Sequence, residues 1–489
     1  MPWNCPINID IAAAARKLLG FHSLWPGQQE AIDALLHGRD VVLIQPTGSG
    51  KSAVYRVAGA LLPGATLVIS PLIALQKDQA DSIGVSGLEP PAVINSTLTA
   101  GDQRETLERI EGGQVECIFL APEQLRKPET LDCLRQANVS LIAIDEAHCI
   151  SQWGHDFRPD YLLLGPVIEG FGHPPVLALT ATASREVRDE IVQRLGLRNP
   201  RILVHGFDRP NISLRVDQFS SQREKEEAIR RRIEFADKPG IVYVATHKNA
   251  ETIAADLNRA GIPAAFYHGG LRPREREEIQ NRFMSGQVPV IVATNAFGMG
   301  VDKPDIRFVY HADVADSLDG YYQEIGRAGR DGEPAEAVLF YRPQDISAQQ
   351  FKTGPSHVDA AALEAVYNVL RRKRNPISRH DLADASGIPP RKLAILLQKL
   401  EDCGAATLFD SGEVQAASKR LLSEIVDETS QRQQQQKEVR KQRLHKMQQY
   451  AEGRSCRREF LLRYFGDDYQ GPCGNCDRCE VNGLLRRAA

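Results

Sequence analysis

Val41-Val42-Leu43-Ile44, followed after two residues by Thr47-Gly48-Ser49-Gly50-Lys51-Ser52, is the stretch that decides the fold. A short apolar run of this kind is typical of a buried strand. A glycine-rich turn after such a strand directs backbone N–H groups toward phosphate oxygens, while its lysine contacts the outer phosphates and its hydroxyl binds Mg²⁺. We therefore expect Lys51 to contact a nucleoside triphosphate and Ser52 to ligate Mg²⁺. The rest of the predicted phosphate loop is Thr47, Gly48, Ser49 and Gly50.

A second apolar run, Leu141-Ile142-Ala143-Ile144, leads into Asp145-Glu146-Ala147-His148. A carboxylate at the end of a second parallel strand completes the Mg²⁺ shell in phosphate-transferring sites, and a neighbouring carboxylate orients the attacking water. We expect Asp145 to reach the metal, Glu146 to act as the base and His148 to belong to the same catalytic group. Gln45 stands where the longer phosphate-loop pattern has glycine, so the loop is of a shorter type.

Further apolar runs alternate with helical patterns along most of the chain. They occupy 66–70, 117–120 and 176–180, and, after a pause near 206–211, 240–244, 264–267, 288–292 and 339–341. Continuous apolar strands between helices indicate parallel sheets covered on both faces. The predicted fold class is therefore α/β, with two tandem recombinase-like domains at 1–205 and 206–345.

Three further sets of residues fit nucleotide chemistry. Upstream, Phe21 can stack on a base and the amide of Gln28 can pair with an adenine edge, although packing alone would also explain both. In the second domain, Gln323 precedes Arg327 and Arg330, which would share one face of a helix. We expect Gln323 to bind nucleotide and the two arginines to stabilise the transferring phosphate. A surface salt-bridge pair is the alternative for the arginines.

The pattern changes to helices from about residue 358. Apolar stripes predict three helices, and 405–409 with 413–414 predict a hairpin, so 358–415 resembles a winged-helix domain. A generic helical connector is the alternative. Residues 417–452 read as one long or two shorter polar helices that connect this domain to the C-terminal region.

Four cysteines near the end have the spacing C-x16-C-x2-C-x2-C. Such a set of thiolates fits a structural tetrahedral Zn²⁺ site, with an iron–sulfur cluster as the alternative. The predicted zinc module covers 453–482. Beside it, Arg457, Arg458 and Arg463 are expected to add phosphate contacts. The predicted ligands are Cys456, Cys473, Cys476 and Cys479.

Charge is distributed unevenly along the 489 residues. The net charge is −3, but 371–399 carries +6 and 430–463 carries +7, which leaves −16 elsewhere. Two basic segments on an acidic body suit a nucleic-acid partner, although solvated helix faces would also produce them. No apolar run is long enough to span a bilayer, and the N-terminus lacks a signal-peptide pattern. We therefore expect a cytoplasmic, nucleoid-associated protein with no membrane partner.

Taken together, these residues resemble the RecQ family of superfamily 2 DNA helicases, from about Leu18 to Tyr341. The motifs at 70–79, 121–125, 179–183 and 293–305 follow in the family's order. The most specific stretch is the aromatic-rich loop at 149–159. The resemblance implies that its Trp153, Phe157 and Arg158 sense single-stranded DNA and license hydrolysis, since aromatic rings stack on unpaired bases. It also implies 3′-to-5′ translocation on single-stranded DNA and unwinding of partially duplex DNA in recombination and repair, with ATP, Mg²⁺ and Zn²⁺ as cofactors.

Two departures from the family pattern bear on function. Trp25 stands where the family usually has an arginine, and the winged-helix-like segment precedes the cysteines instead of following them. An RNA-remodelling ATPase and a DNA-binding scaffold remain as alternative functions. The RecQ-like aromatic loop favours DNA over RNA, and the complete hydrolytic motifs speak against a scaffold. Protein partners and oligomeric state are not predicted.

Overall fold

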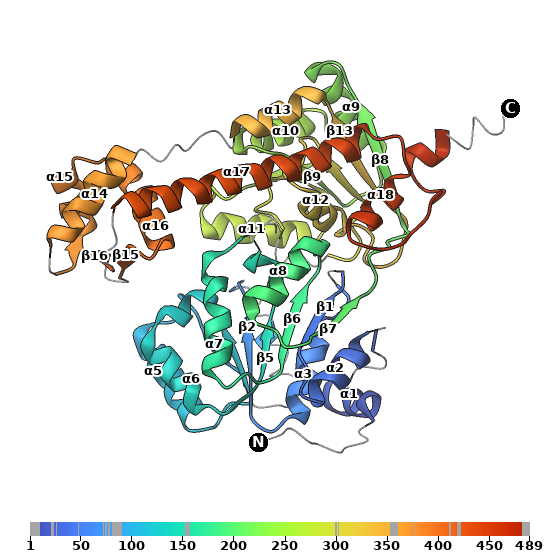
Figure 1. The fold of residues 1–489 in the computed structure, drawn as a ribbon. Helices are drawn as coiled ribbons and strands as arrows, with labels where there is room; N and C mark the ends of the chain where they lie inside the picture. The colour runs from blue at the N-terminus through green and yellow to red at the C-terminus, as the bar shows by residue number, and fades with distance from the viewer. Residues whose placement is uncertain are drawn as a thin grey trace. The chain divides into compact units, whose positions relative to one another are not determined.

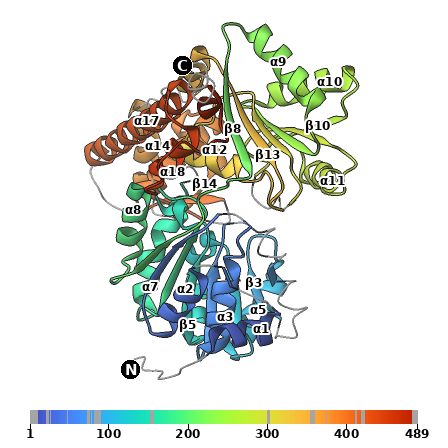
Figure 2. The same ribbon diagram turned by 90° about the vertical axis from the view of Figure 1, so that its right-hand side faces the viewer.

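The structure, a computed structural model, places the chain in two compact units. One comprises Met1–Ile346 with Leu444–Ala489, and the other Ser347–Arg443 (Figures 1 and 2). The described residues are 10–20, 24–25, 27–46, 48–71, 73, 76, 79–80, 90–151, 157–298, 301, 303–352, 360–373, 375–409, 412–417 and 422–481.

The first unit contains a seven-stranded sheet in the order β3-β4-β2-β5-β6-β1-β7, in which every pair of neighbours is parallel. Because all carboxyl ends of a parallel sheet meet at one edge, the loops after β1, β2, β5 and β6 lie together there. The strands are β1 (Val41–Ile44), β2 (Ala65–Ile69), β3 (Ala92–Ile94), β4 (Cys117–Leu120), β5 (Val139–Ile144), β6 (Val176–Thr180) and β7 (Arg201–Val204).

Helices cover both faces of this sheet, as the apolar runs predicted (Figure 1). Val41 and Leu43 pack with α1–α3, whereas Val42 and Ile44 pack in the core that includes α5–α8. Successive strand residues point to opposite faces, so a run that is apolar at every position has two cores to fill. The helices are α1 (Ile11–Leu19), α2 (Gln28–Leu36), α3 (Ser52–Leu61), α5 (Ala100–Glu111), α6 (Pro128–Gln136), α7 (Leu164–Gly170) and α8 (Arg185–Leu195), with 3-10 turns η1 (Pro122–Arg126), η2 (Ala147–Ile150) and η3 (Pro159–Leu163).

A second sheet in the same unit has six parallel strands in the order β10-β11-β9-β12-β13-β8. The predicted fold class of two tandem parallel-sheet domains is thereby confirmed. Strands β3, β7, β8 and β12 were not predicted. The elements are β8 (Ile212–Gln218), α9 (Gln222–Phe235), β9 (Gly240–Tyr243), α10 (His247–Arg259), β10 (Ala264–Tyr267), α11 (Pro273–Met284), β11 (Val290–Ala293), β12 (Phe308–His311), α12 (Leu318–Ile325), β13 (Ala335–Tyr341) and α13 (Pro343–Lys352).

In the second unit, the described residues between 360 and 416 form three helices and a small antiparallel sheet, β14-β16-β15. This arrangement agrees with the predicted winged-helix-like pattern: the apolar stripes form one core, and Ser378 caps its helix by accepting from Asp381 N. The elements are α14 (Ala360–Arg372), β14 (Ile377–Ser378), α15 (Arg379–Ser386), α16 (Pro390–Asp402), β15 (Ala406–Leu408) and β16 (Glu413–Ala416).

The polar connector is one helix, α17 (Leu422–Glu452), rather than two. Its last turns belong to the first unit, where Met447 and Tyr450 are buried. Helix α18 (Arg457–Tyr464) follows directly and lies beside β8 (Figure 2). The C-terminal cysteines thus join the core of the second sheet.

Candidate functional site

The phosphate loop lies between β1 and α3, as predicted. Gly48 and Gly50 have φ values of +84° and +73°, a region that glycine enters without strain. The Lys51 ammonium donates to the carbonyls of Gln45 at 2.9 Å and Pro46 at 3.2 Å, so it lies across the loop. Ser52 is the first residue of α3. Thr47 lies outside the described residues.

The acidic pair follows β5 at the same sheet edge. Asp145 N donates to Ile69 O at 2.8 Å, and Asp145 Oδ1 accepts from Glu146 N at 3.0 Å. Burial raises the pKa of Asp145 to about 6, with the charge of Glu146 adding to the rise and Lys51 opposing it. Burial likewise lowers the pKa of Lys51, against the pull of the two carboxylates. The lysine and both acids therefore share one desolvated site.

Glu146 has a φ of +48°, a strained conformation for a side chain with a Cβ. This left-handed backbone conformation leads directly into η2, and the following turn places His148 beside the Glu146 carboxylate. His148 Nδ1 lies 3.3 Å from Glu146 Oε2 and 2.9 Å from Thr180 Oγ1 at the end of β6. Burial lowers the pKa of His148, but Cys149 and Glu146 outweigh burial and leave it raised. His148 therefore links the acidic pair to the motif at 179–183.

Gln28 has partners other than the expected adenine edge. Its Nε2 donates to Ser49 O at 2.9 Å and Gly50 O at 3.1 Å, and its Oε1 accepts from Trp25 N at 2.9 Å. The buried amide thus fastens the start of α2 to the phosphate loop, and adenine recognition would require an exchange of these bonds. Phe21 lies outside the described residues.

The two arginines do not share a helix face, which corrects the prediction. Helix α12 ends at Ile325, and Arg327 and Arg330 lie in the turns of residues 326–331, here called the arginine turn. Gln323 is half-buried within α12, one helical turn before Arg327. The helix ends at Ile325 because the backbone carbonyls that follow it accept hydrogen bonds from a side chain distant in the sequence.

Arg330 reaches the first sheet's phosphate loop. Its Cδ lies 3.5 Å from the position that a Cβ would occupy at Gly48. Its positive charge contributes to the lowered pKa of Lys51. Its Nη1 also donates to Val301 O at 3.1 Å. Arg327 is buried, and within the described part of the chain its Nε has no hydrogen-bond partner. A buried guanidinium N–H without a partner suits a bound anionic group.

Arg209 holds the arginine turn, a role that the sequence did not reveal. Its Nη1 donates to Gly326 O at 3.0 Å, and its Nη2 donates to Ala328 O and Gly329 O, both at 2.8 Å. Gly329 has a φ of +55°, and a Cβ there would lie 2.5 Å from Asn211 Nδ2. The only signal in the sequence was the pause in the alternation of apolar runs at 206–211, and nothing in that pause singled out Arg209.

The aromatic-rich loop is described only in part. Trp153 lies outside the described residues, whereas Phe157 and Arg158 are half-buried. Arg158 Nη1 donates to Pro71 O at 3.1 Å, which joins the loop to the motif at 70–79.

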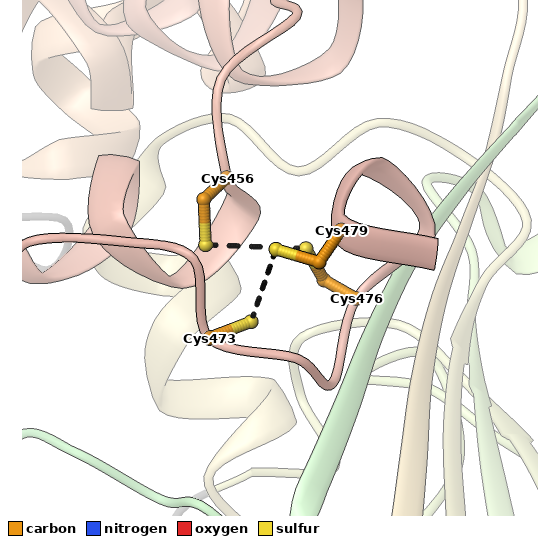
Figure 3. A group of neighbouring side chains, drawn as sticks. All are labelled: Cys456, Cys473, Cys476 and Cys479. Carbon is orange, nitrogen blue, oxygen red and sulfur yellow. Dashed lines mark hydrogen bonds between the residues drawn. The ribbon is translucent and has the colours of Figure 1, made fainter. Parts of the chain in front are cut away.

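The four predicted cysteines converge, as Figure 3 shows. Their sulfurs all lie within 4.8 Å of one another, with 3.9 Å between Cys473 and Cys479 and 4.0 Å between Cys456 and Cys476. Sulfurs of a tetrahedral site with Zn–S bonds of about 2.3 Å would lie about 3.8 Å apart. The hydrogen bond with Cys473 lowers the pKa of Cys476, which favours a thiolate. The set fits Zn²⁺ with little rearrangement.

The expectation that Arg457 and Arg458 contact phosphate is not supported, because both are buried and paired within the chain. Arg457 Nε and Nη2 each lie 3.0 Å from the Asp477 carboxylate. Arg458 donates to the carbonyl of Arg209, in the linker between the sheets (residues 205–211), and to that of Ile212, the first residue of β8. Arg463 is exposed and pairs with Glu459 at 3.2 Å. Charge in a sequence does not show whether a side chain is buried.

Comparison with known families covers each part of this site. Residues 25–190 match the DEAD/DEAH box helicase family, 224–332 the helicase conserved C-terminal domain, and 416–480 the RecQ zinc-binding family. The probable ATP-dependent DNA helicase RecS of Bacillus subtilis is 36% identical over 96% of this chain and 91% of its own length. The chain belongs to the RecQ family of ATP-dependent DNA helicases.

Two further relatives, both named ATP-dependent DNA helicase RecQ, are longer than this chain. That of Pasteurella multocida is 36% identical over 98% of the chain but 64% of its own length. That of Haemophilus influenzae is 36% identical over 95% and 62%. The chain thus spans less than two thirds of these two relatives. The expected cofactors ATP, Mg²⁺ and Zn²⁺ agree with the RecQ family match and with the cysteine cluster.

Solved structures support the fold alone, because their sequences are distant. Helicase MrfA bound to DNA is 17% identical, with a TM-score of 0.58 over 85% of this chain and 60% of its own. Helicase Lhr of Mycobacterium smegmatis, bound to single-stranded DNA and AMP-PNP, is 21% identical, with a TM-score of 0.53 over 83% and 61%. Among the described residues, no helix of this RecQ-family chain is long and apolar enough to cross a membrane.

Proposed function

We propose that this chain hydrolyses ATP between its two sheets and uses the cycle to move 3′-to-5′ along single-stranded DNA and unwind duplex. One observation carries the proposal: Arg330, from the second sheet's domain, lies against Gly48 of the first sheet's phosphate loop. An arginine supplied from a separate domain makes hydrolysis depend on how the two domains meet, which links phosphate chemistry to motion.

Each residue of the site has a role in this proposal. Lys51 would contact the β- and γ-phosphates, and Ser52 and Asp145 would hold Mg²⁺. Glu146 would orient the attacking water, and His148 would relay the state of the acids to Thr180. Arg327 and Arg330 would stabilise the charge of the transferring phosphate. The remaining nucleotide contacts would come from Phe21, Gln28, Thr47, Gly48, Ser49, Gly50 and Gln323.

Single-stranded DNA would trigger hydrolysis through Trp153, Phe157 and Arg158. The bond from Arg158 to Pro71 supports this, because it ties the aromatic-rich loop to a second motif at the same sheet edge. The winged-helix-like unit adds a basic segment at 371–399, which suits contact with the duplex part of a partially unwound substrate. We place this work in DNA recombination and repair, in the cytoplasm and at the nucleoid.

A strand-displacement assay with the Lys51→Ala variant tests the proposal. The variant should bind a partially duplex DNA with a 3′ overhang yet neither hydrolyse ATP nor separate the strands. Lys17→Ala, an exposed lysine on α1, is the matched control and should unwind as the wild type does. Unwinding at the wild-type rate by Lys51→Ala would refute the site, and preference for a 5′ overhang would refute the polarity.

The aromatic-rich loop is tested separately with Trp153→Ala. We expect this variant to keep its basal ATPase rate and to lose most of the stimulation by single-stranded oligonucleotides. Phe235→Ala, which removes an exposed aromatic ring on α9, serves as the control. Stimulation at the wild-type level in Trp153→Ala would show that the loop does not sense DNA, and stronger stimulation by RNA than by DNA would favour an RNA-remodelling ATPase.

A further inference from the structure

We propose that Arg458 and Arg209 are positioning residues through which the zinc module holds the arginine turn in place for ATP hydrolysis. The inference rests on the proposed function, since it assigns a supporting chain of contacts to Arg327 and Arg330. It gives the zinc centre a part in the hydrolytic step itself, separate from contact with DNA.

The first link joins the zinc module to the linker between the sheets. Arg458 follows the ligand Cys456 by two residues and is buried. Its Nη2 donates to Arg209 O at 2.9 Å and Ile212 O at 2.7 Å, and its Nε lies 3.0 Å from Asp208 Oδ1. One guanidinium therefore fixes the backbone on both sides of residues 210–211.

The second link joins the linker to the arginine turn. Arg209 accepts from Arg458 through its backbone carbonyl and donates through its side chain to three carbonyls, those of Gly326, Ala328 and Gly329. Those three carbonyls flank Arg327 and precede Arg330. Burial lowers the pKa of Arg209, and its bonds to these carbonyls satisfy the desolvated cation. A single residue, Arg209, thus connects Arg458 of the zinc module to the arginine turn.

The cysteine knuckle supports the same linker from its other end. Asn475, between two of the cysteines, donates through Nδ2 to Pro210 O at 2.9 Å, and its carbonyl accepts from Leu214 N at 3.3 Å. Leu214 also forms a bridge with Cys476. A Zn²⁺ ion held by the four cysteines would fix the knuckle and so support these bonds.

Aromatic contacts complete the support beyond α18. The ring of Phe465 stacks on Phe207 of the linker, with centroids 4.9 Å apart, and lies 4.8 Å from Tyr322 of α12. Its carbonyl accepts from Arg188 of α8, in the first sheet's domain. The zinc module therefore contacts the linker, the helix that leads into the arginine turn, and the domain that carries the phosphate loop.

Steady-state kinetics at saturating single-stranded DNA test the inference. We expect Arg209→Met and Arg458→Met to lower kcat for ATP at least tenfold, while KM for ATP and the Kd for DNA stay within twofold. Zinc content should remain one per chain. Arg223→Met, which replaces an exposed arginine on α9, is the matched control and should leave all four quantities unchanged.

A double-mutant cycle separates positioning from other effects. In an Arg327→Ala/Arg330→Ala background, adding Arg458→Met should change kcat less than twofold, because both arginines that the contact positions are already gone. Multiplicative losses would overturn the inference, as would an unchanged kcat in both single variants. If Arg330→Ala itself leaves kcat unchanged, the proposed site fails instead, so the two failures are distinguishable.

Buried arginines are risky to replace, so charge-conserving variants provide a second measure. Arg209→Lys and Arg458→Lys keep the buried cation but cannot reach several carbonyls at once. If the methionine variants lose zinc or aggregate, the lysine variants should still show the kcat loss with unchanged DNA affinity and the same non-additivity in the Arg327→Ala/Arg330→Ala background. Wild-type kcat in both folded lysine variants would overturn the inference.

Discussion

Lys225 shows at the scale of a single residue how a charge is accommodated in this fold. It is almost completely buried on α9, and its Nζ lies 2.8 Å from Asp345 Oδ2. Arg342 also pairs with Asp345, at 3.0 Å. A buried ion pair costs desolvation but becomes destabilising chiefly when one partner is removed. The pair fastens α9 to the segment where the first unit ends.

Replacement of Lys225 by methionine should therefore destabilise the first unit by about 3 kcal/mol, because Asp345 would stay buried with Arg342 as its remaining cationic partner. Urea unfolding followed by circular dichroism measures the change. Arg223→Ala, on the same helix, removes an exposed pair with Glu227 and should cost less than about 1 kcal/mol. Equal losses in the two variants would contradict the argument.

Cys117 allows a prediction of pH dependence. Burial raises its pKa to about 12, so in the folded chain the thiol stays protonated through neutral and mildly alkaline pH. An unfolded thiol ionises near pH 8.5. The raised pKa contributes stability that is complete below about pH 8.5 and is lost as pH rises toward 12.

Iodoacetamide labelling with peptide mass spectrometry checks this, since only a thiolate reacts. At pH 8 the native chain should leave Cys117 unmodified for hours, and chain unfolded in urea should react within minutes. Rapid modification in the native chain would show that this strand end is not protected as the structure describes.

At the scale of elements, the sequence predicted strands better than helix ends. Runs such as Val41–Ile44 are apolar at every position because both sheet faces are covered, and their short length favours a strand over a buried helix. The end of α12 had no comparable signal, because the bonds from Arg209 that occupy the following carbonyls come from 117 to 120 residues away. Contacts of that range leave no local pattern.

Helix α17 has a polar middle section and a packed C-terminal end, so the effect of packing on helix stability can be measured within it. The stretch Gln433-Gln434-Gln435-Gln436 suggested a frayed section, yet the helix is continuous through it. In proteins most of the stability of a helix comes from the packing of its apolar face. Amide hydrogen exchange should therefore be fast over 431–438 and at least a hundredfold slower near Met447 and Tyr450, which are buried. Uniform protection along α17 would contradict this account.

At the scale of the whole molecule, the sequence predicted that Lys51, Asp145 and Arg330 meet in the candidate site but not what holds them. Lys51 and Asp145 follow strands of one parallel sheet, so their convergence was expected from strand order alone. Arg330 was expected opposite them, and the structure places it against Gly48. The roles of Arg209 and Arg458 were not foreseen, because residue type shows neither burial nor the partners of a guanidinium.

The central claim is that Arg330 and the phosphate loop form one hydrolytic site that unpaired DNA activates. The steady-state ATPase rate of the purified full chain, with Mg²⁺ and with or without a single-stranded DNA oligonucleotide, tests it most directly. We predict strong stimulation by the oligonucleotide in the wild type and at least a hundredfold lower stimulated rate in Arg330→Ala. A folded wild-type chain that consumes no ATP under these conditions, or an Arg330→Ala variant as fast as the wild type, would contradict the claim.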